Sequence, residues 1–336
     1  MTDRIPYRQA IARQPDALEA CLATVSKRLE NVDLGPITRG TTVLAGIGAS
    51  LYAAVAAAAQ MRAQGLRAFA LPATDLYDAS VNPADAYIAF SASGRSVEPA
   101  RAMELRPDAA TYGIAKAGNT PLSNVVRHMI ATASGDDSGP NTTSYIGSLL
   151  SAALIADKAG RSLGTRWATL PNALQALLDQ VQPAADRAAR LLAGRAAIDC
   201  VGAGWALGTA GYASLLIREA ARVPAQDWDT LNFLHGPMEP NDKGTGVILF
   251  GDGREEKLAQ DLPGFGIPTV LVTGRSDIAD AENRVVIQVP PFAAGIGDAI
   301  LHSVAAQLLT ATLSEAAGLP VCEFRYRQTD TKLPEA

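Results

Sequence analysis

The chain carries one pattern twice: an apolar run that ends in Gly-x-Gly. The first run lies at residues 41–48 and the second at residues 197–204, and a helix-like segment follows each of them. Two further pairs of apolar runs keep nearly the same offset, Ala86–Phe90 with Gly246–Phe250 and Ala110–Ala115 with residues 268–273. A repeat of this length predicts two copies of one folding unit.

The repeated runs are short and continuously apolar, and they alternate with helix-like segments. This is typical of parallel βαβ units whose sheet is covered by helices on both faces. We therefore predict an α/β fold of two tandem three-layer αβα sandwiches with parallel, flavodoxin- or Rossmann-like sheets. We expect a helical lead-in at 1–38, a first domain at 39–180, a second domain at 181–318 and a polar tail at 319–336.

The composition excludes several classes of protein. The chain of 336 residues is 48% hydrophobic and 19% charged, which indicates a globular protein. Its net charge of -5 argues against a nucleic-acid partner. The three cysteines are far apart and lack metal-ligand spacing, so we expect a reduced, cytoplasmic protein without a metal site.

Two segments bear on membranes. The N-terminus mixes charged and small residues, unlike a signal peptide. Residues 43–61 carry no charge, but they are rich in alanine and contain Gly46, Gly48 and Gln60. A strand, a tight turn and an alanine-rich helix explain this segment better than a membrane span, so we expect no membrane association.

A Gly-x-Gly after a strand also raises the possibility of a nicotinamide dinucleotide site. The first copy lacks the third glycine of that motif. No acidic residue ends a second strand about twenty residues further on. We therefore expect no such cofactor.

The segment Ser91-Ala-Ser-Gly-Arg-Ser96 follows the apolar run Ala86–Phe90 and precedes a predicted helix at 97–105. Ligands of parallel α/β sheets bind at such junctions, where the helix start offers free N–H groups to an anion. Gly94 allows the backbone to fold closely around a ligand. Alternatively, the hydroxyls only cap the helix.

Other junctions favour a phosphate site. Ser50 and the Thr142–Ser144 segment supply hydroxyls at similar positions of the first copy. The second copy has no hydroxyl at residues 250–255, and its Asp252 would repel an anion. The repeat thus predicts one phosphate site, in the first half of the chain.

The second half contains a candidate acid–base pair. Glu219 lies on the apolar stripe of a predicted helix, so it is either paired with Arg218 or Arg222 or has a raised pKa suited to proton transfer. His235 opens a His-Gly-Pro turn, which places its imidazole on a loop. A paired core carboxylate and a surface histidine are the alternatives without function.

These motifs together resemble the sugar isomerase (SIS) family, in particular its tandem members such as the isomerase half of glucosamine-6-phosphate synthase and the fructosamine-6-phosphate deglycases. The resemblance runs from Arg13-Gln-Pro15, through both serine junctions, to the spacing of Glu219 and His235. It implies that Glu219 moves a proton between C1 and C2 and that His235, supplied by the partner of a homodimer, assists ring opening. It implies no metal and no redox cofactor. The residues that the resemblance assigns to the phosphate and the sugar are Gly48, Ser50, Ser91, Ser93, Gly94, Ser96 and Thr143.

The chain departs from the family at two places. Arg95 stands where the synthase has an acidic residue, and it can strengthen phosphate binding or reach a charged group elsewhere on the substrate. Relatives also carry an arginine and then a lysine in their tail, and the lysine closes over the sugar. Here Arg325 is followed by Thr329 at the lysine position, and Lys332 is a candidate substitute.

The resemblance implies a homodimeric enzyme for an amino-sugar or ketosamine 6-phosphate, with the active site at the subunit interface. Its reaction would couple aldose–ketose isomerisation to release or addition of ammonia or an amine, as in a deaminase, a deglycase or a glutamine–fructose-6-phosphate aminotransferase without its glutaminase domain. Two alternatives stay open: a non-catalytic sugar-phosphate-binding regulator, and a simple phosphosugar isomerase. The presence of both Glu219 and His235 favours an enzyme.

Overall fold

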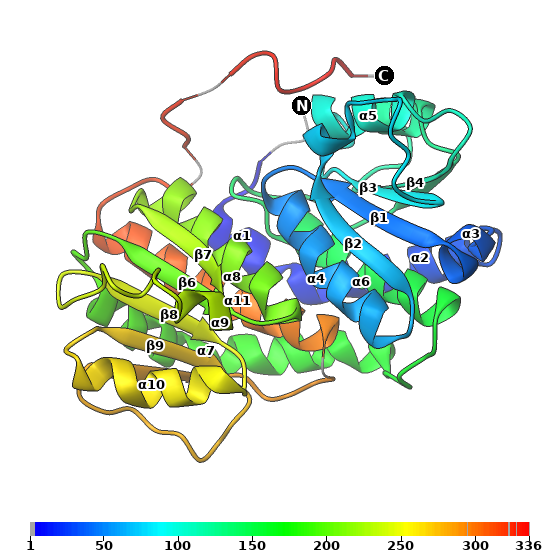
Figure 1. Cartoon of the computed structure of the whole chain (residues 1–336). Coiled ribbons are helices and arrows are strands. Elements are labelled where there is room, and N and C mark those ends of the chain that lie inside the picture. The colour runs from blue at the N-terminus through cyan, green and yellow to red at the C-terminus, as the bar shows by residue number, and fades with distance from the viewer. Residues whose placement is uncertain (1–3, 294, 322, 327, 336) are drawn as a thin grey trace.

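The computed structural model describes residues 4–293, 295–321, 323–326 and 328–335. Its described residues form two five-stranded sheets in which every strand pairing is parallel. The predicted α/β fold with parallel sheets is therefore confirmed, and the repeated apolar runs are strands. Figure 1 shows the two sheets on opposite sides of the molecule with helices between them.

The two sheets have the same topology. The strands of the first sheet are β1 (Thr41–Gly46), β2 (Arg67–Pro72), β3 (Ala86–Phe90), β4 (Ala110–Ala115) and β5 (His128–Ala131), in the order β2-β1-β3-β4-β5. Those of the second are β6 (Ile198–Gly202), β7 (Ala225–Asp229), β8 (Gly246–Phe250), β9 (Thr269–Thr273) and β10 (Arg284–Gln288), in the order β10-β9-β8-β6-β7. Counted from the β7 edge, the second order repeats the first.

The backbone of the two glycine turns shows the repeat directly. Gly48 precedes helix α4 (Ala49–Ala63) with φ 55° and ψ -133°, and Gly204 precedes helix α8 (Trp205–Leu216) with φ 61° and ψ -121°. Because both turns need a positive φ, glycine is the residue that adopts them without strain. Sequence and backbone conformation thus repeat together.

Helices α4 and α8 pack against each other between the sheets (Figure 1). Their backbones approach closely, since a Cβ atom on Gly208 would lie 2.6 Å from the carbonyl oxygen of Tyr52. The small side chains of α4, including Ala53, Ala54, Ala56 and Ala57, are fully buried there. This packing explains why residues 43–61 lack charge.

The remaining helices enclose the two sheets. The long ones are α2 (Gln14–Leu29), α6 (Thr143–Ala159), α7 (Leu170–Leu192), α10 (Arg254–Gly264) and α11 (Ile296–Ala316), and the shorter ones are α1 (Tyr7–Ala12), α3 (Gly35–Arg39), α5 (Val97–Glu104) and α9 (Thr230–Phe233). Both faces of each sheet are buried. In β3, Ile88 belongs to the large central core, whereas Tyr87 packs with Met103 of α5 on the outer face. On the second sheet, Leu249 packs with Leu258 of α10.

Among the described residues, one helix is long and apolar enough to cross a membrane by length and composition. This helix is α11, and 89% of its most apolar stretch is buried inside the protein. It packs against α7 and α8. Its apolar character therefore matches its place in the core.

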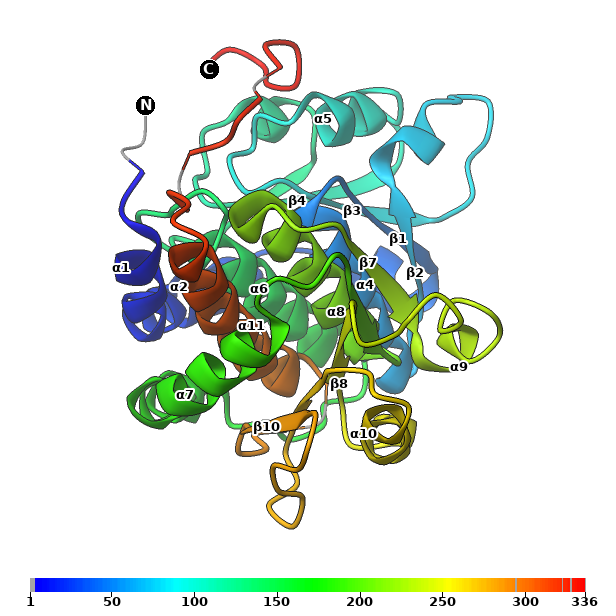
Figure 2. The ribbon, with the colours of Figure 1, turned by 90° about the vertical axis from the view of Figure 1, so that its left-hand side faces the viewer.

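Helix α7 runs through the position expected for the domain boundary, between residues 180 and 181. The division into two domains stays a prediction. After α11 the described tail residues extend along the molecule to the side of α5, as Figures 1 and 2 both show.

Candidate active site

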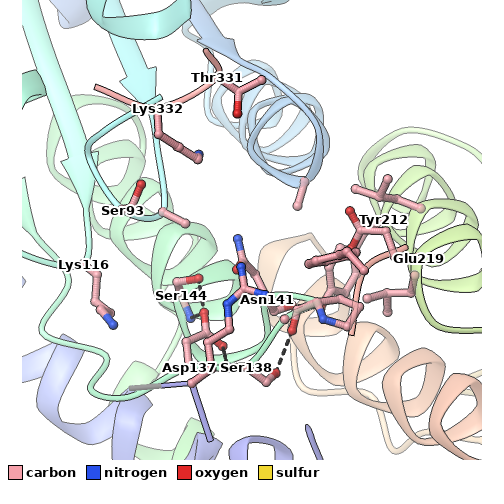
Figure 3. Close-up of a pocket in the computed structure, with 18 residues that line it drawn as sticks. Ser93, Lys116, Asp137, Ser138, Asn141, Ser144, Tyr212, Glu219, Thr331 and Lys332 are labelled. Atoms are coloured by element: carbon pink, nitrogen blue, oxygen red, sulfur yellow. Dashed lines mark hydrogen bonds between the residues drawn. The ribbon is translucent and has the colours of Figure 1, made fainter. Parts of the chain in front are cut away.

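A cavity of about 490 Å³ lies where the first sheet faces α8. Three of its residues follow neighbouring strands: Ala49 after β1, Ser93 after β3 and Lys116 after β4. The opposite wall comes from α8 and the turn that follows it, and the tail adds Thr331 and Lys332. In Figure 3, Ser93 and Lys332 lie on one side of the cavity and Tyr212 and Glu219 on the other. Carboxyl ends of parallel strands are where such folds bind ligands.

The serine loop, residues 91–96, is held by hydrogen bonds within itself. The Ser96 N–H donates to the Ser91 hydroxyl over 3.3 Å, and the Arg95 N–H donates to the Ser93 hydroxyl over 3.3 Å. The Ser91 N–H donates to the carbonyl oxygen of Ile114 in β4 over 3.0 Å. Ser96 then serves as the N-cap residue of α5. These bonds fix the conformation of the loop.

Gly94 is required by this loop for two reasons. Its φ of +67° is in the region that favours glycine. A Cβ atom at this position would also collide with the side chain of Thr120. The close approach to a ligand stays a prediction for Gly94, and the neighbour that the structure shows is Thr120.

The predicted phosphate residues lie at different depths. Of the described residues that line the cavity, Ser93 is the one drawn from that predicted set. Ser91 and Ser96 are buried, and Ser50 is half-buried beside the lining residue Ala49. Gly48 is exposed at the start of α4. Of these junctions, Ser93 and Ala49 are the points that reach the cavity.

Thr143 has another partner. Its hydroxyl donates to the carbonyl oxygen of Asp136 over 2.9 Å, and its side chain is fully buried. From this segment, Asn141 and Ser144 line the cavity instead.

Asp137 was not anticipated from the sequence. Its carboxylate accepts the backbone N–H groups of Thr142, Thr143 and Ser144 over 2.8, 3.2 and 3.2 Å. The hydroxyls of Thr142 and Ser144 donate to it as well. A carboxylate here accepts hydrogen bonds from the otherwise free N–H groups of the α6 N-terminus. Its negative charge also interacts favourably with the helix dipole. An acidic residue shortly before a Thr-Thr-Ser helix start is the signal that could have revealed it.

Glu219 lies in a π-helical turn, Ile217–Ala221, that continues α8. Burial raises the pKa of its carboxyl to about 7, against the opposing effect of Arg218 and Arg4. Within the described part of the chain, no side chain is hydrogen-bonded or ion-paired to this carboxylate. Of the two sequence interpretations, the raised pKa is therefore the one that the structure supports. Such a group can accept a proton near neutral pH.

His235 lies on the exposed turn after α9. Its backbone N–H donates to the carbonyl oxygen of Asn232 over 3.0 Å. In the described part of this single chain, His235 does not line the cavity that contains Glu219.

The tail contributes Lys332 to the cavity. The Lys332 ammonium donates to the Ser96 hydroxyl over 2.7 Å, and burial lowers the pKa of this lysine. Arg95 points to the tail, where it binds the carbonyl oxygen of Leu333 and the carboxylate of Glu335. Arg325 lines a neighbouring cavity of about 390 Å³, to which Glu219 also contributes.

Sequence reasoning missed several further lining residues. Arg4 comes from the lead-in, Lys116 follows β4, and Tyr212 lies on α8. The Tyr212 hydroxyl donates to the carbonyl oxygen of Asn141 over 2.6 Å and thus joins the two walls. Among the described residues, no group of three histidine, cysteine or acidic side chains could hold a metal ion.

Comparisons with known proteins agree with this architecture. A glutamine–fructose-6-phosphate aminotransferase of Sulfolobus acidocaldarius is 22% identical over 293 residues, which cover 83% of this chain and 48% of that protein. The chain thus spans about half the length of the curated relatives that it matches. No family model matches the chain.

Three solved structures share the fold over nearly their whole length. The C-terminal domain of a Francisella tularensis glucosamine-fructose-6-phosphate aminotransferase has a TM-score of 0.81 at 16% identity and covers 95% of this chain and 98% of its own. A tagatose-6-phosphate ketose/aldose isomerase of Escherichia coli has a TM-score of 0.80 at 20% identity, with coverages of 96% and 97%. A glucosamine-6-phosphate deaminase of Thermotoga maritima has a TM-score of 0.77 at 18% identity, with coverages of 96% and 98%. The chain thus shares its fold with these three proteins and is similar in sequence to the aminotransferase.

Proposed function

We propose that this chain is a phosphosugar isomerase-type enzyme that acts on an amino-sugar or ketosamine 6-phosphate. The observation that carries the proposal is the single cavity that joins Ser93 of the serine loop to Glu219. An anion site and a proton acceptor in one cavity are what isomerisation of a sugar phosphate requires. The related proteins named above act, by their names, on such compounds.

In the proposed reaction, the phosphate binds at the serine loop, with Ser50, Ser91, Ser93 and Ser96 around it. Glu219 removes a proton from the carbon next to the carbonyl or imine carbon and returns it to the neighbouring carbon. For a ketosamine, this step moves the double bond to form an imine between C1 and the nitrogen. Water then hydrolyses the imine and releases the amine and an aldose 6-phosphate. A carboxyl whose pKa is about 7 can both accept and return the proton near neutral pH.

A panel of ketosamine and hexosamine 6-phosphates tests this proposal. We expect one or more of them to be converted with release of ammonia or an amine, and Glu219→Gln to slow the conversion about 10²- to 10⁴-fold. Aldose–ketose conversion without a free amine would identify a simple isomerase. Binding without turnover across the whole panel would contradict an enzyme and favour a sugar-phosphate-binding regulator.

We further propose that each of the two sheets, with its helices, is one SIS unit and that the enzyme is a cytoplasmic homodimer. His235 is exposed and lies outside the Glu219 cavity of the described chain, which supports its delivery by a partner subunit. Mixing two inactive variants, Glu219→Gln and His235→Ala, tests this arrangement. If the site combines residues of both subunits, hybrid dimers contain one intact site, and roughly a quarter of the wild-type activity returns. If His235 acts within its own subunit, mixing restores nothing.

A further inference from the structure

The described tail residues run antiparallel to the serine loop. The Leu333 N–H donates to the carbonyl oxygen of Arg95 over 2.8 Å, and the Val97 N–H donates to that of Thr331 over 3.4 Å. Lys332 and Ser96 form the bridge pair between these two bonds. The tail therefore lies directly along the segment expected to bind phosphate.

Arg95 adds side-chain bonds to this pairing. Its Nε donates to the carbonyl oxygen of Leu333 over 2.8 Å, and its Nη1 donates to Glu335 over 2.9 Å. These bonds use the fixed fork of a guanidinium, which a lysine would not reproduce. Arg95 is not among the described residues that line the cavity, so its charge is directed to the tail.

Lys332 points the other way, into the cavity. Its ammonium donates to the Ser96 hydroxyl over 2.7 Å, while Ser96 also begins α5. The ammonium thus lies beside the Ser96 hydroxyl at the start of α5, in the same cavity as Ser93. Lysine provides a compact positive charge that binds phosphate without a required orientation.

We propose that the tail is a phosphate clamp, in which Lys332 is a phosphate ligand and Arg95 is the positioning residue that holds the tail against the serine loop. This inference rests on the proposed phosphate site. It gives Lys332 a role that needs a protonated ammonium, whereas imine formation needs the neutral amine. The two roles therefore predict different behaviour of Lys332→Arg.

The test measures binding of inorganic phosphate by calorimetry, with thermal melting to confirm that each variant is folded. We expect Lys332→Met to weaken phosphate binding about tenfold or more, because a charge-assisted contact is lost. Lys332→Arg should stay within about threefold of the wild type, since the positive charge remains. Arg187→Met is the matched control, because it removes another arginine–carboxylate pair away from this loop. Arg187 lies on α7 and forms a 2.8 Å pair with Asp280.

A double-mutant cycle separates the two residues. Arg95→Met should weaken phosphate binding in the wild type and have no further effect in Lys332→Met, since Arg95 acts through the tail. Arg95→Met should also speed tryptic cleavage after Lys332, because the tail is released. If Arg95 only bound phosphate directly, its substitution would leave the cleavage rate unchanged. Additive losses, with cleavage unchanged, would overturn the positioning role of Arg95.

The outcomes also separate this inference from the proposed function. If the wild type binds no phosphate, the phosphate site itself is absent and both fall. If the wild type binds phosphate and Lys332→Met binds it equally well, the clamp alone is wrong. With a substrate found by the panel, borohydride trapping of a covalent adduct on Lys332 would also overturn the clamp and support an imine role.

Discussion

Ser93 and Glu219 line the same cavity, although Ser93 follows a strand of the first sheet and Glu219 follows the α8 helix beside the second. The two copies of the repeat thus contribute different groups to one cavity. The first supplies the serine loop, which is the proposed anion site. The second supplies the half-buried Glu219, which is the proposed proton acceptor. Because the two groups come from separate elements, substitutions should affect binding and turnover separately.

The pH dependence of turnover should report Glu219. A base acts when it is deprotonated, so kcat/KM should rise with pH through about 7, the raised pKa of this carboxyl. Below that pH it should fall about tenfold per pH unit. Measuring kcat/KM between about pH 5 and 9 checks this. An acid limb near the ordinary carboxyl pKa, which is about 4.3, would contradict the assignment.

The ionised Glu219 carboxylate should also lower the free energy of unfolding at neutral pH. The pKa of its carboxyl in the folded protein is about 7, above the ordinary value of about 4.3, so its favourable contribution is fully present below about pH 4.3 and is lost as the pH rises through about 7. Glu219→Gln should therefore be more stable than the wild type at pH 8, by up to about 3 kcal/mol, and no more stable at pH 4. Urea unfolding at both values measures this. The exposed Glu19→Gln on α2 is the control, and an equal gain there would show that the effect is not one of burial.

His302 should act in the opposite direction. It is buried in α11, edge-on to Trp205 at 5.3 Å between ring centroids, and its Nδ1 has no hydrogen-bond partner in the described structure. Burial lowers its pKa to about 4. The neutral imidazole thus makes its full contribution to stability above the ordinary histidine pKa of about 6.5. This contribution is lost as the pH falls toward 4.

His302→Leu should remove this acid sensitivity, worth up to about 3 kcal/mol between pH 6.5 and 4. The measurement is urea unfolding of the variant and the wild type across this range. Parallel pH curves for wild type and variant would rule out His302 as the cause.

The sequence predicted those features that depend on neighbouring residues. The apolar runs became strands because alternating side chains such as Tyr87 and Ile88 bury opposite faces of one sheet. The serine loop and Glu219 could be named as candidates for the same reason, since each stands in a recognisable local pattern, and Ser93 and Glu219 line one cavity. The repeat itself was visible because both glycine turns need the same backbone conformation.

The features that sequence reasoning missed depend on contacts between distant segments. The sequence named Lys332 as a candidate, but it did not predict that the tail pairs with the serine loop, because no local pattern encodes that pairing. Arg95 was expected to strengthen phosphate binding or to reach a charged group of the substrate, whereas it binds Leu333 and Glu335 of the tail. Asp137 caps α6 from outside the helix, at a distance along the chain that ordinary capping patterns do not cover.

Gly94→Ala should disrupt the serine loop. The new methyl group meets Thr120 and the backbone must keep a φ of +67°. We expect a loss of roughly 2–3 kcal/mol and of phosphate binding. Gly65→Ala is the matched control, because Gly65 has a φ of +85° but open space around its Cβ position. It should cost only about 1 kcal/mol and leave phosphate binding intact. Equal effects of the two changes would show that backbone strain, and not contact with Thr120, governs the loop.

Asp137→Ala should loosen the start of α6 beside the cavity. The N–H groups of Thr142, Thr143 and Ser144 lose their acceptor, which should cost about 2–4 kcal/mol in urea unfolding. The neighbouring Asp136→Ala is the control. Its carboxylate forms an exposed 3.3 Å pair with Arg13, and its loss should cost less than about 1 kcal/mol. Because free N–H groups at a helix start bind anions, added formate should restore stability to Asp137→Ala and not to the wild type. Equal stabilisation of both proteins by formate would contradict the assignment of Asp137 as the internal anion of this helix.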